Sequence, residues 1–149
     1  MSKDIIVGLD AGTSLIKFVA FDLDGKVIES ASVRNKVYYR SGSKAEQSLN
    51  ETWDKVIDSF NQLQEKIDNL KDRILGISIT GQGDGSWPID KNADPVGDAA
   101  LWLDGRSGDI IDDWRNSSIG PSISKITHTG LNASMQCGQM FHIFHNEKD

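Results

Sequence analysis

The strongest constraint on the fold is the stretch IIVGLDAGTSLIKFVAFDLDGKVI, residues 5–28. Residues 5–9 form a continuous apolar run rich in β-branched side chains, which is typical of a strand that is covered on both faces. Residues 15–21 and 26–33 read as two further strands, and the Asp24-Gly25 dipeptide between them favours a hairpin turn. The first 34 residues therefore predict a three-stranded antiparallel meander.

A helix and a fourth strand are expected next. Apolar residues recur at three- and four-residue spacing over residues 49–70, which predicts an amphipathic helix with one core-facing stripe. Residues 74–80, ILGISIT, then read as a strand, and the strand–helix–strand order implies a crossover with at least one parallel pair. The polar stretch 35–48 is interpreted as an exposed loop.

The remainder of the chain predicts shorter elements. Residues 87–90 are expected to form an edge strand and residues 100–104 a short buried strand, and three short helices are expected over residues 108–115, 118–127 and 136–146. Neither an internal repeat nor a low-complexity linker interrupts the sequence. The sequence therefore predicts one α/β domain over residues 1–149.

Charge and hydropathy exclude several classes of protein. A formal net charge of −6 and a pI near 5.0 argue against non-specific binding to nucleic acid or to an anionic membrane, because both surfaces would repel the chain. The apolar stretches fall far short of the roughly 20 residues needed to cross a bilayer. We therefore expect a cytoplasmic protein, with neither nucleic acid nor membrane as a partner.

The first predicted hairpin carries the chemistry of an anion site. Gly12 would let a ligand approach the backbone, Thr13 and Ser14 add hydroxyl groups, and Asp10 could hold a hydrated Mg²⁺. Lys17 could reach a terminal phosphate as a point charge. These residues fit a polyphosphate cradle, and an ordinary hairpin with a Gly-Thr turn remains the alternative.

Two familiar nucleotide motifs are excluded. The sequence lacks the Gly-x-x-x-x-Gly-Lys-Ser/Thr string of a P-loop. The cluster Gly81-Gln-Gly83-Asp-Gly85 has the wrong last spacing for a dinucleotide-binding fingerprint and runs into Trp87-Pro88. The second glycine cluster must therefore have another role.

The hairpin sequence resembles the opening of the FGGY carbohydrate kinases, and other blocks agree with it in order and spacing. GSKAEQSLNETW (42–53) is similar to the segment that leads those kinases into their first long helix, and ILGISITGQGDG to their strand and sugar-contacting turn. DPVGDAALWLDGRS resembles their tryptophan-containing block, and HTGLNASMQCGQM the segment that closes over the sugar. Each block alone is weak, but together they cover nearly the whole chain.

The resemblance implies a fold and a pair of cofactors. The fold would be ribonuclease H-like, as in the actin, heat-shock and hexokinase ATPases, with a mixed sheet that opens in an antiparallel meander and is flanked by helices. ATP would be the phosphate donor and Mg²⁺ its counterion, with Gly12, Thr13, Ser14 and Lys17 at the phosphates and Asp10 at the metal. A different substrate on the same ATPase fold is an alternative that the later blocks argue against.

The later blocks most resemble those of erythritol and related polyol or ketose kinases. Glycerol kinases carry Arg-Glu in the turn where this chain has Gly83-Asp84. The resemblance implies a substrate site made of Gln82, Gly83, Asp84, Trp102, Asp104 and Arg106. Two alternatives without a binding role remain. Trp102 could be an ordinary residue of the hydrophobic core, and Asp104 and Arg106 could form a structural ion pair.

Family members are about three times as long, so this chain is expected to be an incomplete N-terminal domain whose partner is the missing C-terminal, adenine-binding domain. The resemblance places the catalytic base in that missing part, and the chain alone is expected to be inactive. A homodimer is left open. The alternative function is a non-catalytic relic or module that binds a sugar or a partner protein.

Overall fold

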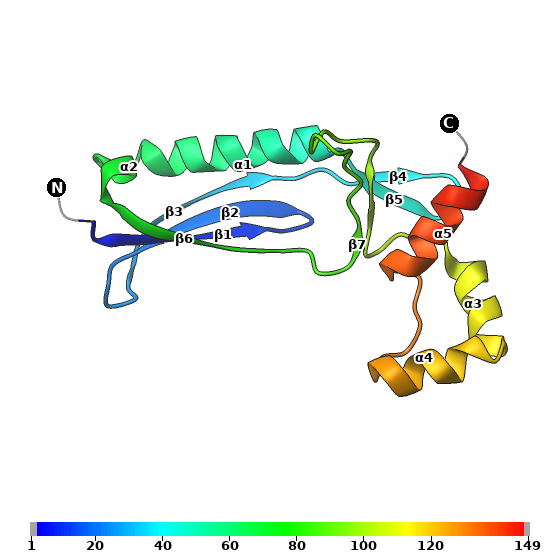
Figure 1. Cartoon of the computed structure of the whole chain (residues 1–149). Coiled ribbons are helices and arrows are strands. Elements are labelled where there is room, and N and C mark those ends of the chain that lie inside the picture. Colours follow the sequence, from blue (N-terminus) through cyan, green and yellow to red (C-terminus); the bar gives the residue numbers. More distant parts are fainter. Residues whose placement is uncertain (1–2, 148–149) are drawn as a thin grey trace. The chain divides into compact units, whose positions relative to one another are not determined.

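The computed structural model describes residues 3–147 and forms two compact units (Figure 1). The first unit comprises the chain up to Val37 and residues Asn50–Gln82, and the second comprises Tyr38–Leu49 and the chain from Gly83 onward. Each unit has a four-stranded sheet of its own. The chain divides in this way because the segment expected to be a loop, residues 35–48, contains two strands that pair within the second unit.

The first unit contains the predicted meander and crossover. Its sheet has the order β3-β2-β1-β6, made of β1 (Ile5–Ala11), β2 (Leu15–Phe21), β3 (Val27–Arg34) and β6 (Ile74–Gly81). The β1–β2 and β2–β3 pairs are antiparallel, whereas β1 and β6 are parallel. The meander of three strands and the parallel fourth strand are therefore confirmed.

The long helix is shorter than its sequence pattern predicts. α1 spans Leu49–Gln64, and the short α2 (Leu70–Arg73) follows after a turn in which Asn69 has a left-handed φ of 55°. Ile67 and Leu70 are still buried. The apolar spacing therefore predicted burial correctly up to Leu70. The single helix that it predicted is interrupted by the turn between α1 and α2, which contains Asn69.

One face of the first sheet packs against α1 (Figure 1). Alternate strand residues point to this face, because successive side chains of a strand lie on opposite sides of the sheet. The aromatic rings of Phe18 and Phe60 meet edge to face with centroids 5.4 Å apart. The buried core of the unit includes Ile5, Val7, Leu9, Ile16, Phe18, Ala20, Val56 and Leu63.

The second unit joins short strands to three helices. Its sheet has the order β4-β5-β8-β7, made of β4 (Tyr38–Arg40), β5 (Lys44–Gln47), β7 (Gly85–Ser86) and β8 (Ala99–Leu101). The helices are α3 (Gly108–Asn116), α4 (Ile119–Thr127) and α5 (Gln136–Asn146), as predicted within one residue or two. The strand expected over residues 87–90 is reduced to a single bridge between Ile89 and Pro95.

Over residues 3–147, every helix is too short or too polar to cross a bilayer.

Candidate functional site

The loop between β1 and β2 is closed by its own backbone. The Gly12 amide donates to the Leu15 carbonyl oxygen at 3.1 Å. A Cβ added to Gly12 would lie 2.8 Å from that same oxygen, which is closer than real Cβ contacts allow. Glycine is therefore required here by the tightness of the turn, and the turn holds Thr13 and Ser14 at its tip.

Asn35 braces this loop, and the sequence analysis did not identify it. Its backbone amide donates to the Ser14 carbonyl oxygen at 3.0 Å, and its side-chain amide donates to the Gly12 carbonyl oxygen at 3.4 Å. The Thr52 hydroxyl on α1 lies 3.4 Å from the Asn35 side-chain oxygen. The position of an asparagine directly after β3, the strand that runs beside the loop, is the signal that could have revealed it.

Three polar side chains form a row across the open face of the first sheet. In the strand register Asp10 is opposite Lys17 on β2 and opposite Thr80 on β6. Paired residues of neighbouring strands present their side chains on the same face, here the one away from α1, since Leu9 beside Asp10 is in the core. All three line a hollow of about 180 Å³ together with Ser78.

The row places one carboxylate, one ammonium and one hydroxyl at the end of the sheet where the Gly12–Ser14 loop lies. Asp10, Lys17 and Thr80 are all exposed. A carboxylate oxygen suits a hard cation such as Mg²⁺, and an ammonium suits a phosphate oxygen. The geometry can therefore hold a metal–phosphate group on this face.

In the second unit, Asp84 directly precedes β7 and Trp102 directly follows β8. Gly85 is paired with Leu101 in the antiparallel β7–β8 ladder, so Asp84 and Trp102 flank the same end of that ladder. Gly85 has a φ of 104°, and a Cβ there would lie 2.6 Å from the Ala100 carbonyl oxygen. Only glycine allows the two backbones to approach so closely.

Asp84 and Trp102 are both available to a ligand. The Asp84 carboxylate is exposed, and the Trp102 side chain is 51% exposed, so the interpretation of Trp102 as core is wrong. The exposed aromatic ring offers a flat apolar wall to a polyhydroxylated molecule, and the carboxylate offers a hydrogen-bond acceptor. This pair is the centre of the candidate substrate site.

A third element supports Asp84. The Ser134 hydroxyl lies 3.0 Å from Asp84 Oδ2, and the Ser134 amide donates to Asn132 Oδ1 at 2.9 Å. The segment is anchored on both sides, because the Ser107 hydroxyl donates to the Ala133 carbonyl at 2.9 Å and the Gln139 side-chain amide donates to the Leu101 carbonyl at 2.8 Å. These hydrogen bonds attach residues 132–139 to Asp84, to Ser107 and to the end of β8.

Asp104 and Arg106 form a buried ion pair. Arg106 Nε donates to Asp104 Oδ1 at 2.8 Å and Arg106 Nη2 donates to Asp104 Oδ2 at 2.9 Å. The two side chains are 0% and 3% exposed, respectively. Arg106 also contacts Glu46 on β5 at 2.5 Å and Glu147 at 3.0 Å. The alternative of a structural ion pair is therefore confirmed, and its charged atoms face one another.

The network fixes the protonation of its members. Burial opposes the ionisation of Asp104, but hydrogen bonds from Arg106 and from the Ala45 amide outweigh burial and lower the pKa of the Asp104 carboxyl. Burial likewise opposes the charge of Arg106, but its carboxylate partners raise the pKa of the guanidinium. Both groups remain charged at neutral pH.

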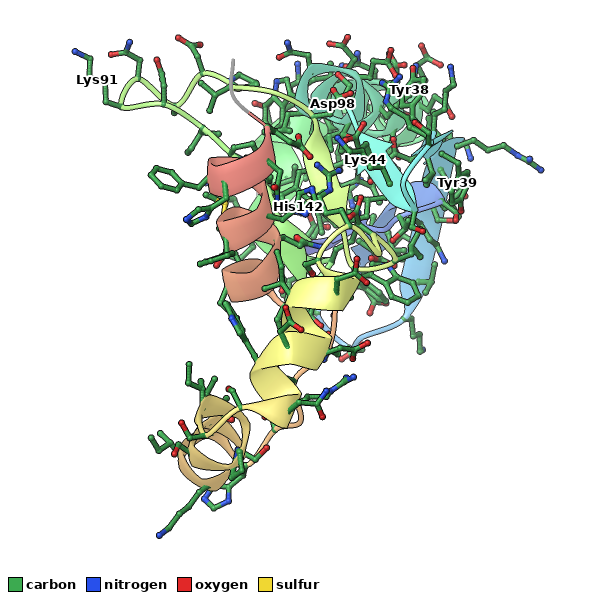
Figure 2. The ribbon with its side chains drawn as sticks, turned by 90° about the vertical axis from the view of Figure 1, so that its right-hand side faces the viewer. Tyr38, Tyr39, Lys44, Lys91, Asp98 and His142 are labelled. Carbon is green, nitrogen blue, oxygen red and sulfur yellow. The ribbon has the colours of Figure 1, made fainter. Side chains whose placement is uncertain are left out.

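A second cation and a histidine complete the network at the end of α5. Burial disfavours the charged form of Glu147, but the Lys44 ammonium and Arg106 outweigh it and lower the pKa of the Glu147 carboxyl. Lys44 and His142, labelled in Figure 2, lie 2.7 Å and 3.6 Å from the same Glu147 oxygen. The ion pairs thus tie β5, the loop after Trp102 and α5 into one assembly.

The predicted site residues fall into two groups. Asp10, Lys17 and the loop residues Gly12, Thr13 and Ser14 lie together in the first unit. Gln82 is half-buried directly after β6, at the end of that unit. The second unit holds Gly83, Asp84, Trp102, Asp104 and Arg106.

Solved structures with the same chain path define the class of fold. A ligand-bound xylulose kinase from Lactobacillus acidophilus matches 99% of this chain and 29% of its own, with a TM-score of 0.88 and 21% sequence identity. A gluconate kinase from the same species matches 96% of this chain and 28% of its own, with a TM-score of 0.87 and 22% identity. The fold is therefore that of the actin/hexokinase-like carbohydrate kinases.

Sequence comparison identifies the family. Residues 5–148 match the N-terminal domain of the FGGY family of carbohydrate kinases, and the chain belongs to this family. It is 41% identical over 140 residues to an erythritol kinase of Brucella abortus, which covers 94% of this chain and 27% of that protein. It is 36% identical over 107 residues to a xylulose kinase of Staphylococcus epidermidis, which covers 72% of this chain and 22% of that protein.

Proposed function

We propose that this chain is the N-terminal portion of an ATP-dependent kinase that phosphorylates a hydroxyl group of a small polyol or ketose. The observation that carries the proposal is the 41% identity to an erythritol kinase over 94% of the chain. Because that match covers 140 of the 149 residues, it includes Gly12, Asp84 and Trp102. A small polyol is accordingly the first substrate class to test.

The hairpin would bind the terminal phosphate of ATP. Gly12, Thr13 and Ser14 offer backbone and hydroxyl groups at the tip of the turn, and Lys17 offers a single positive charge from the same face of the sheet. In-line phosphoryl transfer depends mainly on positioning and on neutralising charge. Asn35, by holding the loop carbonyls of Gly12 and Ser14, keeps these groups in place.

Asp10 would hold Mg²⁺ at this phosphate. Its exposed carboxylate lines the hollow next to Thr80, so the donors present suit a hard cation. Within residues 3–147 no three His, Cys, Asp or Glu side chains converge into a metal site. A single protein carboxylate is sufficient for Mg²⁺, which commonly completes its shell with waters and substrate phosphates. When bound, the ion would neutralise phosphate charge.

The second unit would bind the polyol. Asp84 would accept hydrogen bonds from substrate hydroxyls, the Gly83 backbone would add a polar contact, and Trp102 would cover the apolar side of the carbon chain. Asp104 and Arg106 would act indirectly, because their charged atoms are buried against each other and against Glu46. Their role would be to fix the loop that carries Trp102.

The remaining requirements of the reaction would come from another part of the kinase. This chain spans about a quarter of the length of the erythritol kinase that it matches. We expect the general base and the adenine site to lie in the other part, which would act as the C-terminal partner domain. The 149 residues alone would then transfer no phosphate. A non-catalytic binding module is the competing function.

A fusion protein tests the proposal. Residues 1–149 are joined to the part of the Brucella erythritol kinase that follows its matched region, and ATP-dependent phosphorylation of C4–C6 polyols and ketoses is measured. We expect turnover of at least one polyol, and none from either part alone. A folded fusion that binds a polyol in a thermal-shift assay but phosphorylates none would favour the binding module instead.

A further inference from the structure

Three Asp-Gly dipeptides occur in the chain, at residues 24–25, 84–85 and 104–105. In such a dipeptide the glycine amide nitrogen can attack the side-chain carboxyl carbon of the aspartate, because glycine has no β-carbon to hinder the approach. The product is a cyclic succinimide, which opens to isoaspartate. The reaction requires an accessible carboxyl group and a glycine amide that is not engaged in a hydrogen bond, and the fold supplies these two conditions unequally.

The dipeptide Asp104-Gly105 meets neither condition. The Asp104 side chain is 0% exposed, and both of its carboxylate oxygens accept hydrogen bonds from Arg106. This guanidinium favours the ionised carboxylate, whereas the loss of water requires the neutral carboxyl group. The Gly105 amide donates to the Ser43 carbonyl oxygen at 2.9 Å. The fold therefore protects this dipeptide.

The dipeptide Asp24-Gly25 meets only the first condition. Asp24 is exposed in the turn between β2 and β3. The Gly25 amide, however, donates to the Asp22 carbonyl oxygen at 3.1 Å, and the Asp24 amide donates to Asp22 Oδ1 at 3.0 Å. Attack by the Gly25 nitrogen would first have to break the hydrogen bond that closes this turn.

The carboxyl group of Asp84 is accessible. Asp84 is exposed, and its Oδ2 atom lies 3.0 Å from the Ser134 hydroxyl. A hydroxyl is a neutral donor, so it does not hold the carboxylate in its ionised form as a guanidinium does. Asp84 therefore differs from Asp104 both in its exposure and in the charge of the group that contacts it.

The amide of Gly85 lacks the acceptor that its strand partner would normally offer. Gly85 is paired with Leu101 in the β7–β8 ladder. The Leu101 carbonyl oxygen already accepts from the Asp104 amide at 3.0 Å and from the Gln139 side-chain amide at 2.8 Å. These two donors occupy both lone pairs of that oxygen. β7 is also the outer strand of its sheet, so an amide that is not directed at β8 points away from the sheet.

We propose that Asp84-Gly85 is a site of spontaneous rearrangement to isoaspartate, and that the fold protects the other two dipeptides from the same reaction. A bond forms between the Gly85 nitrogen and Asp84 Cγ, and the amide proton leaves with the carboxyl hydroxyl group as water. Water then adds to the backbone carbonyl carbon of the succinimide, and the bond from that carbon to the Gly85 nitrogen breaks. The water that was lost is regained, so the mass of the chain is unchanged.

The rearrangement would disrupt the candidate substrate site. The main chain would pass through Asp84 Cγ and would be longer by one carbon atom directly before β7. The ladder leaves little room for this change, because even a Cβ on Gly85 would lie 2.6 Å from the Ala100 carbonyl oxygen. The free carboxylate would be attached to Cα instead of Cβ and would move away from Ser134. The loss of polyol affinity that we expect from this change rests on the proposed function.

Mass spectrometry of the aged chain tests the proposal. The 149-residue chain is kept folded at neutral pH for several weeks, and its peptides are fragmented by electron transfer, which distinguishes isoaspartate from aspartate. We expect isoaspartate to accumulate at least about five-fold faster at Asp84 than at Asp24, because attack at Asp24 must first break a hydrogen bond. Asp104 should remain unchanged. An aged chain without isoaspartate at residue 84, or with equal amounts at residues 84 and 24, overturns the proposal.

The same chain unfolded in guanidinium chloride is the control for the effect of the fold. All three dipeptides then lose their contacts and should form isoaspartate at similar rates. A preference for Asp84 that persists in the unfolded chain would mean that the neighbouring sequence determines the rate, and this result also contradicts the proposal.

Two matched variants check which dipeptide reacts. Asp84→Glu and Asp24→Glu each keep the charge of an exposed side chain, but a glutamate must close a six-membered ring, which is a much slower reaction. The total isoaspartate, measured by enzymatic methylation, should fall to a small part of its wild-type amount in Asp84→Glu and should be unchanged in Asp24→Glu. The reverse result would assign the reaction to the turn between β2 and β3 and would exclude Asp84. Thermal melts check that both variants fold.

Protection by a polyol separates this inference from the proposed function. The fusion with the Brucella complement, which is the part of that kinase after its matched region, is aged with and without a C4 polyol. A bound polyol that engages Asp84 should slow the rearrangement. Isoaspartate that forms at residue 84 at the same rate in both samples would support the modification site and contradict the role of Asp84 in polyol binding.

Discussion

Asp10 and Lys17 lie directly opposite each other in the β1–β2 ladder, so a carboxylate and an ammonium share one face of the sheet beside the Gly12–Ser14 loop. Both side chains are exposed and line the same hollow. The hairpin thus sets two opposite charges side by side without burying either one. This is the arrangement expected where a cation and a phosphate bind together.

Replacing Asp10 should therefore reduce turnover much more than substrate affinity. In the fusion with the Brucella complement, Asp10→Ala should lower kcat by about 100-fold or more, because a charge-stabilising group at the phosphate is lost. The KM for the polyol should change by less than about two-fold, since the polyol contacts are elsewhere. Steady-state kinetics over a range of polyol concentrations measure both.

Asp24→Ala is the matched control, because Asp24 is an exposed carboxylate in the turn between β2 and β3. It should retain wild-type kinetics. Unchanged turnover in Asp10→Ala would exclude a role for Asp10 at the metal or the phosphate.

The buried Arg106 should be a major source of stability for the second unit. Arg106→Met would leave Asp104 buried without its partner and would remove a contact of Glu46 and of Glu147. Removing one member of a buried ion pair costs about 3–5 kcal/mol. Urea denaturation of the 149-residue chain, followed by circular dichroism, should show a lower free energy of unfolding of this size.

Arg40→Met provides the comparison, because Arg40 contacts the same Glu46 carboxylate at 2.6 Å from a side chain that is 52% exposed. An exposed ion pair contributes at most about 1 kcal/mol. Equal losses in the two variants would mean that burial does not determine the strength of this network.

The same network predicts how stability depends on pH. The pKa of Asp104 is lowered in the folded chain relative to its ordinary value of 3.8, so the unfolded chain binds the proton more readily. The stabilisation is therefore present above pH of about 4 and is lost as the pH falls through the lowered pKa. The urea midpoint should fall as the pH is lowered from about 5 to about 3. It should change less over the same pH range in Arg106→Met. An identical acid dependence in both proteins would contradict the coupling.

Much of the first unit follows from local sequence patterns. The meander, α1 and the parallel β6 were each predicted from patterns that extend over a few residues. These patterns include the apolar run of β1, the turn at Asp24-Gly25 and the helical spacing after Ser48. The Gly12–Ser14 loop could be predicted for the same reason, because a turn between two strands with clear apolar patterns is a local feature.

The second unit was less predictable, because its structure depends on distant contacts. β4 and β5 have few apolar residues, and β5 is held by pairing with β8, more than 50 residues away in the sequence. Glu46 looked like part of a polar loop, and only the fold reveals that it contacts Arg106. Asn35 and Ser134 likewise take their roles from neighbours that no local spacing connects to them.

Ser134 offers the sharpest test of the polyol site, because its hydroxyl contacts Asp84 across 50 residues of sequence. In the fusion, Ser134→Ala should raise the KM for the polyol about five-fold, which corresponds to about 1 kcal/mol for one hydrogen bond that positions the carboxylate. Turnover at saturation should stay within about two-fold, because the phosphate groups are untouched.

Ser134→Thr keeps the hydroxyl and should recover most of the affinity, whereas Ser122→Ala removes an exposed hydroxyl of α4 and should have no effect. If Asp84→Ala abolishes polyol binding while Ser134→Ala binds normally, Asp84 orients itself without this contact. If neither change alters the KM, the carboxylate does not face the polyol, and the Trp102 side of the site must carry recognition alone.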